Sequence, residues 1–424
     1  MASIRKGHGV LDPVWQSKRI YAGAASCREC RIGFIVARMH TGNYRLLTQL
    51  LSVPTAPFRE QRVMDFVFAQ LKQADIPHFS DPAGNIIIGS ASAAGYRTLL
   101  RSSSQEPVRV FIAHMDHPGF HGQRWLSPTR LQVKWHGGSP IAHLRSSRVW
   151  LASGDDLLSE ACIVRAKLLP TRHAIDTAEL RLASPLSPAR PAKSLYGGFR
   201  FRAPVWRAGN RLYTQVADDL IGVFAVLATA RAHFRARQRL RTPFIGLLTR
   251  GEEVGFVGAI AHLELGWLAK ARRPLVAVSL ETSRTLPNAL IGKGPVVRLG
   301  DRRTVFDAGY LRILSEVAEQ VLPGKHQRRV MDGGTCEATA VLAWGLPAIG
   351  ISVPLGNYHN EGFEGGPDCA GARGPAPECV HLDDVEGLLK LCSGLMQPGL
   401  AWTDPWGRQR TRLLANFQRY RRYL

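Results

Sequence analysis

The sequence contains no long apolar run. No apolar segment approaches the roughly 18 residues that a helix needs to cross a bilayer. The basic N-terminal segment is not followed by the apolar stretch of a secretory signal peptide. Cysteine is scarce as well, and its seven scattered residues do not predict a disulfide framework. These absences favour a cytoplasmic protein without a membrane span.

Acidic residues are few relative to basic ones. The 33 Asp and Glu residues against 55 Lys and Arg residues give a formal net charge of +22, with arginine concentrated in the C-terminal segment RTRLLANFQRYRRYL. Such a surface attracts polyanions, including nucleic acids. The chain nevertheless lacks a zinc finger, an RNP motif and a basic-region zipper. A nucleic-acid partner is therefore a weaker hypothesis than a solvated or protein-binding surface.

The 424 residues are enough for two domains, or for one large domain with an insertion. Helical periodicity alternates with short apolar runs in 41–122 and in 211–400, which predicts an α/β fold with a mixed sheet flanked by helices. In 123–210 the pattern changes to short β-rich pieces separated by Pro, Gly and Ser, which predicts an inserted small all-β domain. We expect this insertion to serve dimerisation or substrate access. Residues 401–424 form a basic C-terminal tail.

Residues 1–40 fit this pattern poorly, and we interpret them as an N-terminal extension. The extension contains Cys27 and Cys30 in a single CxxC pair, whereas a zinc ribbon needs two such pairs. Together with Cys369 and Cys379 they would supply four zinc ligands. Free thiols are the interpretation that we favour.

A predicted core strand ends in polar side chains in the segment VFIAHMDHPGFHG, residues 110–122. The two-residue period of a strand places His114 and Asp116 on the same face. A carboxylate that holds the second ring nitrogen makes a histidine a better metal ligand. The motif is therefore either half of a metal site or an ordinary polar strand end.

Further polar clusters follow other predicted strands or open the next helix. These are Asp218 with Asp219, Glu252 with Glu253, Glu281, and His359. Taken singly, each has an ordinary explanation as a helix cap, a charged helix start or a loop residue. Because strand carboxyl ends in an α/β sheet converge at one edge, we expect these clusters to lie together.

The combined set matches the needs of two divalent metal ions, which bind nitrogen and oxygen donors and leave positions open for water. Asp218 can bridge the ions, His114 with Glu281 can serve one, and Glu253 with His359 can serve the other. Glu252 is then left without a metal. A free carboxylate beside an activated water acts as a general base.

Several motifs resemble the dizinc aminopeptidases of the glutamyl and deblocking aminopeptidase family, which includes the tetrahedral TET peptidases. The matching stretches are HMDHPGF at 114–120, ADDLIGV at 217–223, GEEVGFVGA at 251–259, IGKGPVVRLGD at 291–301, GGT at 333–335, GLPAIGISVP with YHN within 345–360, and HLDDVEGL at 381–388. The resemblance covers about 43–395 of the chain.

The resemblance implies an aminopeptidase that hydrolyses N-terminal residues from peptides with two metal ions, zinc or else cobalt. It implies the ligands His114, Asp218 as the bridge, Glu253, Glu281 and His359, with Glu252 as general base and Asp116 as the residue that orients His114. It also implies a homo-oligomer, a dimer or larger.

The sequence departs from the family pattern at several positions. Glu281 stands where the family usually has Asp, Leu220 replaces an Arg, and Cys336-Glu337 replace Asp-Ala after GGT. A segment of about twenty residues, EGFEGGPDCAGARGPAPEC, follows His359. These departures leave substrate specificity and assembly open. An N-acyl amino-acid amidohydrolase on the same scaffold and a non-catalytic binding protein remain alternatives.

Overall fold

The structure, a computed structural model, describes residues 39–154, 156–235 and 242–424. Met39–Leu424 form one compact unit. Almost all of the predicted N-terminal extension, including Cys27 and Cys30, lies outside the described residues. No helix in the described part of the chain is long and apolar enough to span a membrane.

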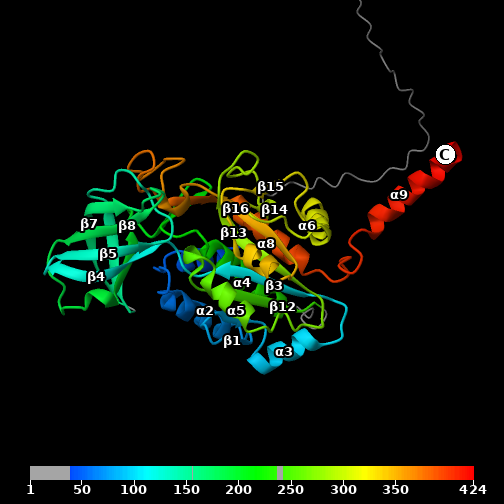
Figure 1. Cartoon of the computed structure of the whole chain (residues 1–424), viewed down its shortest axis with the longest axis horizontal. Helices are drawn as coiled ribbons and strands as arrows, with labels where there is room; N and C mark the ends of the chain where they lie inside the picture. Colours follow the sequence, from blue (N-terminus) through cyan, green and yellow to red (C-terminus); the bar gives the residue numbers. More distant parts are fainter. Residues whose placement is uncertain (1–38, 155, 236–241) are drawn as a thin grey trace, which may run out of the picture. The chain divides into compact units, whose positions relative to one another are not determined.

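An eight-stranded mixed sheet organises this unit (Figure 1). In spatial order its strands are β1 (His78–Ser80), β2 (Ile86–Ile88), β12 (Phe244–Thr249), β3 (Val108–His114), β13 (Leu275–Arg284), β16 (Ala348–Leu355), β14 (Val296–Asp301) and β15 (Gln327–Met331). Strands β12, β3, β13 and β16 run parallel, whereas β2 and β14 pair antiparallel with their inner neighbours. Every residue of β3, β12 and β16 is buried, and β13 is buried through Thr282, as expected for strands covered on both faces.

Helices cover the sheet, so the predicted α/β fold with a mixed sheet flanked by helices is confirmed. The helices are α1 (Thr41–Leu50), α2 (Gln61–Gln73), α3 (Ala93–Arg101), α4 (Leu220–Arg235), α5 (Val257–Glu264), α6 (Ala308–Val321), α7 (Glu337–Ala343), α8 (Leu382–Leu395) and α9 (Gly407–Tyr420). Helix α4 is apolar on nearly all sides because it packs between β3, β12 and β13 and the helices α1 and α8. Helix α9, in the basic tail, buries no residue.

A closed six-stranded barrel follows β3 directly. Its strands are β4 (Gly119–Ser127), β5 (Arg130–His136), β6 (Arg148–Ser153), β7 (Asp156–Leu168), β8 (Ile175–Leu182) and β9 (Leu195–Phe199), in the closed order β4-β5-β8-β7-β6-β9. The barrel has its own core, in which the Trp135 ring lies 5.6 Å from Phe120 and 4.9 Å from Phe199 between ring centroids. Closure leaves the barrel without an unpaired strand edge.

A three-stranded sheet connects two distant parts of the chain. It contains β10 (Val205–Ala208), β11 (Arg211–Thr214) and β17 (Glu378–His381) in the order β10-β11-β17. Strand β17 pairs antiparallel with β11, so that Glu378 lies opposite Thr214. The chain that follows His359 therefore returns to the segment that leads into α4.

A half-buried histidine pair in the barrel, His121 and His136, gives the fold a pH dependence. His121 Nε2 lies 2.8 Å from the Pro57 carbonyl oxygen and its ring packs 4.6 Å from that of His136. Burial, together with the charges of His136 and Arg59, lowers the pKa of His121 to about 4, from an ordinary value of 6.5. The unfolded chain therefore binds a proton between these two values that the folded protein rejects, and stability falls as the pH drops through this window.

We expect His121→Gln, which keeps a hydrogen-bond donor for Pro57, to lose less stability than the parent protein between about pH 7 and about pH 5. Urea unfolding of both proteins at the two pH values measures this difference. His173→Gln, at an exposed position of the same barrel, is the matched control and should follow the parent protein. An equal loss of stability between the two pH values in all three proteins would contradict the prediction.

Candidate metal centre

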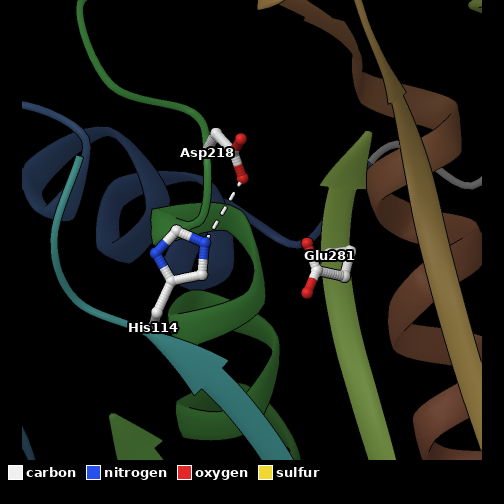
Figure 2. A group of neighbouring side chains, drawn as sticks. All are labelled: His114, Asp218 and Glu281. Atoms are coloured by element: carbon white, nitrogen blue, oxygen red, sulfur yellow. Dashed lines mark ion pairs between the residues drawn. The ribbon is translucent and has the colours of Figure 1, made fainter. Parts of the chain in front are cut away.

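The polar clusters predicted at the strand ends lie at one edge of the sheet. Because β3, β12, β13 and β16 are parallel, their carboxyl ends meet there. His114 ends β3, Glu281 lies near the end of β13, Glu252 and Glu253 lie in the turn Glu252–Val254 after β12, Asp218 precedes α4, and His359 lies in the turn Tyr358–Asn360 after β16. Figure 2 shows His114, Asp218 and Glu281 turned toward a common space from three different elements.

Three groups of side chains among the described residues could hold a metal ion. They are His114, Asp218 and Glu281; His114, Glu252 and Glu253; and Asp218, Glu253 and His359. Within each group one ligand atom per residue lies within 4.8 Å of the others. The first and third groups share Asp218, whose Oδ1 lies 3.5 Å from His114 Nε2 and whose Oδ2 lies 3.6 Å from His359 Nε2. The second group offers a different arrangement in which Glu252 is itself a ligand.

Among His114, Asp218, Glu253 and His359, the closest atom pairs have about the spacing of zinc ligands. Two ligand atoms that each lie about 2.0–2.1 Å from a tetrahedral zinc ion are roughly 3.3–3.4 Å apart. The observed separations are 3.2 Å between His359 Nε2 and Glu253 Oε2, and 3.5 and 3.6 Å for the two Asp218 contacts. His359 Nε2 and Glu253 Oε1 are also buried without a hydrogen-bond partner. Because buried polar atoms are nearly always partnered, these two atoms fit a bound ion.

The pKa values of the cluster are shifted because several carboxyl groups lie close together and are buried. Burial, together with the charges of neighbouring acids, raises the pKa values of Glu252 and Glu281 well above their ordinary range. Burial alone would raise the pKa of Asp218, but its contacts with His114 and His359 outweigh burial and lower it. Burial opposes a charge on His359, yet Glu253 and Asp218 raise its pKa well above 6.5. The cluster thus holds several carboxylates that a cation would stabilise.

Asp116 is buried and contacts the Glu252–Glu253 turn as well as His114. Its Oδ1 accepts the Glu252 backbone N–H at 2.9 Å, and its Oδ2 accepts the Glu253 backbone N–H at 3.1 Å. The same carboxylate lies 3.6 Å from His114 Nδ1, which is closer, at 3.2 Å, to the backbone carbonyl of Asp116. Asp116 therefore fixes the turn that carries both glutamates, a contact that the His-x-Asp motif does not predict.

The sequence did not predict that several other buried side chains lie around the cluster. Glu378 accepts backbone N–H groups from the Asp218 and His359 segments, and His117 lies 2.7 Å from the Asp218 carbonyl oxygen. Glu337 accepts a hydrogen bond from Thr249 Oγ1 at 2.8 Å. His117 lies in the stretch HMDHPGF at 114–120. The sequence singles out Glu337 only because it departs from the family pattern after GGT. Glu378 lies in the inserted segment, where no motif marks it.

A hollow of about 30 Å³ adjoins Glu281. Its lining includes Thr282, Arg284, Leu286, Arg298, Gly333, Gly334, Thr335 and Tyr358. Arg298 is buried, and its Nη1 lies 3.9 Å from Glu281 Oε2. At the rim, the Arg284 guanidinium lies 3.8 Å from the ring centroid of Phe363, in the inserted segment. With this volume the hollow has room for water rather than for an amino-acid side chain.

The barrel also borders the cluster. Gly138, in the loop after β5, lies so close to the His359 ring that a Cβ atom at this position would be 1.9 Å from Nδ1. Glycine is therefore required here for close approach rather than for backbone conformation.

We expect Gly138→Ala to displace His359 and to lower the metal content of the protein, with a loss of stability of about 1–3 kcal/mol from overpacking. Elemental analysis of the dialysed protein measures the metal content. Gly334→Ala is the control, because a Cβ there meets nothing within 4 Å. Unchanged metal content in Gly138→Ala would contradict the prediction.

Comparisons with known proteins show the family and the fold of the chain. The M42 glutamyl aminopeptidase family model matches residues 96–363, more than half of the chain. No curated protein matches the chain.

Solved structures share the fold at low sequence identity. The TET1 peptidase of Pyrococcus horikoshii is 19% identical, with a TM-score of 0.63 over 84% of this chain and 99% of its own. An aminopeptidase of Desulfurococcus kamchatkensis is 19% identical, with a TM-score of 0.66 over 85% and 96%. A TET aminopeptidase of a marine sediment Thaumarchaeota archaeon is 18% identical, with a TM-score of 0.67 over 85% and 98%. Given the extent of the family match, the chain belongs to the M42 glutamyl aminopeptidase family, a family of metal-dependent peptidases.

Proposed function

We propose that the protein is an aminopeptidase that removes N-terminal residues from peptides and uses two divalent metal ions, zinc or else cobalt. The observation that carries the proposal is the position of Asp218, whose two carboxylate oxygens face His114 and His359 separately. One shared carboxylate between two ligand groups is the arrangement that two neighbouring ions need.

The proposed ligands form two sets that share Asp218. His114, Asp218 and Glu281 would hold one ion, and Asp218, Glu253 and His359 would hold the other. Asp116 would support the site by holding the Glu252–Glu253 turn and by lying beside the His114 ring. When bound, two such ions polarise the scissile carbonyl and lower the pKa of a water molecule toward about 7.

Glu252 is the proposed general base. It belongs to neither ligand set, yet its Oε2 lies 3.7 Å from His114 Nε2, so the carboxylate faces the place where the reaction would occur. Burial and neighbouring acids raise the pKa of Glu252, the direction in which a carboxylate becomes a stronger base. Glu252 would take a proton from the attacking water and pass it to the leaving amine.

The surroundings of the cluster suit a peptide with a free N-terminus. The excess of carboxylates would attract the ammonium group of the first residue. An N-acyl amino acid lacks this ammonium group, which is why we place the amidohydrolase second.

The assembly is proposed to be a homo-oligomer, a dimer or larger. The Pyrococcus horikoshii TET1 peptidase is described as assembling into a tetrahedron or a large octahedral shell. No comparison supports a nucleic-acid partner, and we do not propose one.

We expect metal-loaded protein to cleave free-amine aminoacyl-p-nitroanilides, and Glu252→Gln to lower kcat roughly 10²–10⁴-fold while metal content is retained. A panel of these substrates beside N-acetyl amino acids measures this and reads out the preferred first residue. Glu319→Gln, an exposed position on α6, is the control for the charge change. Cleavage of the N-acetyl amino acids alone would indicate an N-acyl amino-acid amidohydrolase instead. Full activity of Glu252→Gln would show that Glu252 is not the general base.

A further inference from the structure

Glu378 makes an unusual set of hydrogen bonds for a buried carboxylate. Its side chain is fully buried at the start of β17. Oε2 accepts the backbone N–H groups of Ala217 at 2.7 Å and Asp218 at 3.1 Å, and Oε1 accepts the backbone N–H of His359 at 2.9 Å. Both oxygens therefore accept from the backbone, and they accept from two segments that are far apart in the sequence.

These two segments carry the proposed bridging ligand and the proposed terminal ligand of the second ion. Neither Asp218 nor His359 lies within a regular strand or helix, so neighbouring backbone bonds do not fix their separation. His117 forms a second connection, since its Nδ1 lies 2.7 Å from the Asp218 carbonyl oxygen and its Nε2 lies 3.2 Å from Asn360 Oδ1. The Asp218 and His359 segments are thus joined twice by side chains that would not themselves touch an ion.

We propose that Glu378 is a positioning residue that sets the separation of Asp218 and His359 and thereby the affinity of the second metal site. The inference rests on the proposed function, because it assumes that these two residues bind metal. An ionised carboxylate only accepts hydrogen bonds, and such bonds from backbone N–H groups are stronger than those between neutral groups. Partners that hold ligands in this way change metal affinity when they are altered.

The inserted segment after His359 reaches the site through the same residue. The chain leaves the site at Asn360 and returns at Ala376, whose N–H donates to the Asn360 carbonyl oxygen at 2.8 Å. Gly356 and Cys379 close the base of the loop with two backbone hydrogen bonds of 2.9 and 3.0 Å. Glu378 therefore lies where the insertion re-enters the fold, next to the ligand after which the insertion began.

The tip of the insertion contacts the barrel. The Ile141 backbone N–H donates to the Arg373 carbonyl oxygen at 3.0 Å, and Arg202 Nε donates to Asp368 Oδ1 at 2.9 Å. Through these contacts and Glu378, one continuous chain of interactions runs from the barrel to the His359 backbone.

The test replaces one acceptor oxygen and keeps the shape. In Glu378→Gln the amide nitrogen cannot accept, so at least one backbone N–H loses its partner. We expect the weaker metal site to bind zinc about 10–100-fold less tightly, measured by calorimetric titration of the metal-free protein. Activity lost at low zinc should return at excess zinc, with KM for the peptide substrate unchanged.

A matched control separates positioning from general stability. Asp384, on α8, is also fully buried and accepts two backbone N–H groups, from Gly292 at 2.6 Å and Gly294 at 2.7 Å, but it belongs to none of the candidate metal groups. Asp384→Asn should lower the thermal midpoint without changing zinc affinity. Should Glu378→Gln fail to fold, Glu378→Asp keeps the charge but is shorter, and should weaken zinc binding in the same direction.

The outcomes distinguish a failure of the positioning role of Glu378 from a failure of the proposed function. Weaker zinc binding in the Glu378 variant with unchanged binding in Asp384→Asn would support the positioning role. Parental zinc affinity in a destabilised Glu378 variant would reduce Glu378 to a structural residue and overturn the inference. A parent protein that binds no zinc at the cluster would instead overturn the proposed function on which the inference rests.

Discussion

The crowding of buried carboxylates at one edge of the sheet is the constraint on which the rest of the structure depends. Asp218, Asp219, Glu281, Glu337 and Glu378 are all buried there, and Glu252 and Glu253 are nearly so. Like charges in a medium of low dielectric constant repel strongly, and desolvation penalises each of them further. Two histidines and Arg298 supply only part of the compensation. Such a cluster is stable when cations bind or when some acids take up protons.

Backbone hydrogen bonds offset part of this repulsion. Asp116 accepts the N–H groups of the Glu252–Glu253 turn, and Glu378 accepts three N–H groups around Asp218 and His359. Each carboxylate is thereby held in one orientation by peptide groups that need an acceptor themselves. The same hydrogen bonds connect turns that follow different strands. They therefore stabilise the buried carboxylates and also hold the parts of the site together.

The departures from the family pattern lie around this edge. Cys336 is buried, its Sγ lies 3.8 Å from Asp301 Oδ2, and burial raises its pKa to about 11, so it remains a neutral thiol. Cys369 and Cys379 are free as well, which leaves the four-cysteine zinc site without support among the described residues. The inserted segment contacts both the barrel and the rim of the hollow, where Phe363 packs against Arg284. These residues, together with Glu281 among the candidate ligands, are where the sequence departs from the family pattern.

The sequence by itself determined the alternation of elements and the identity of the candidate ligands. Parallel strands that are covered on both faces read as unbroken apolar runs, and polar residues just after such runs must meet at one edge of the sheet. The short strands β1 and β15, at the two edges of the sheet, lack such runs and were not predicted, because their pairing depends on neighbours rather than on their own pattern. Tertiary structure alone decided the roles of Gly138 and Glu378. Gly138 matters because the barrel loop touches His359, and Glu378 because β17 pairs with β11, 160 residues from Asp218 along the chain. Contacts between segments so far apart leave no periodic signal in a sequence, because they depend on how complete elements pack against one another.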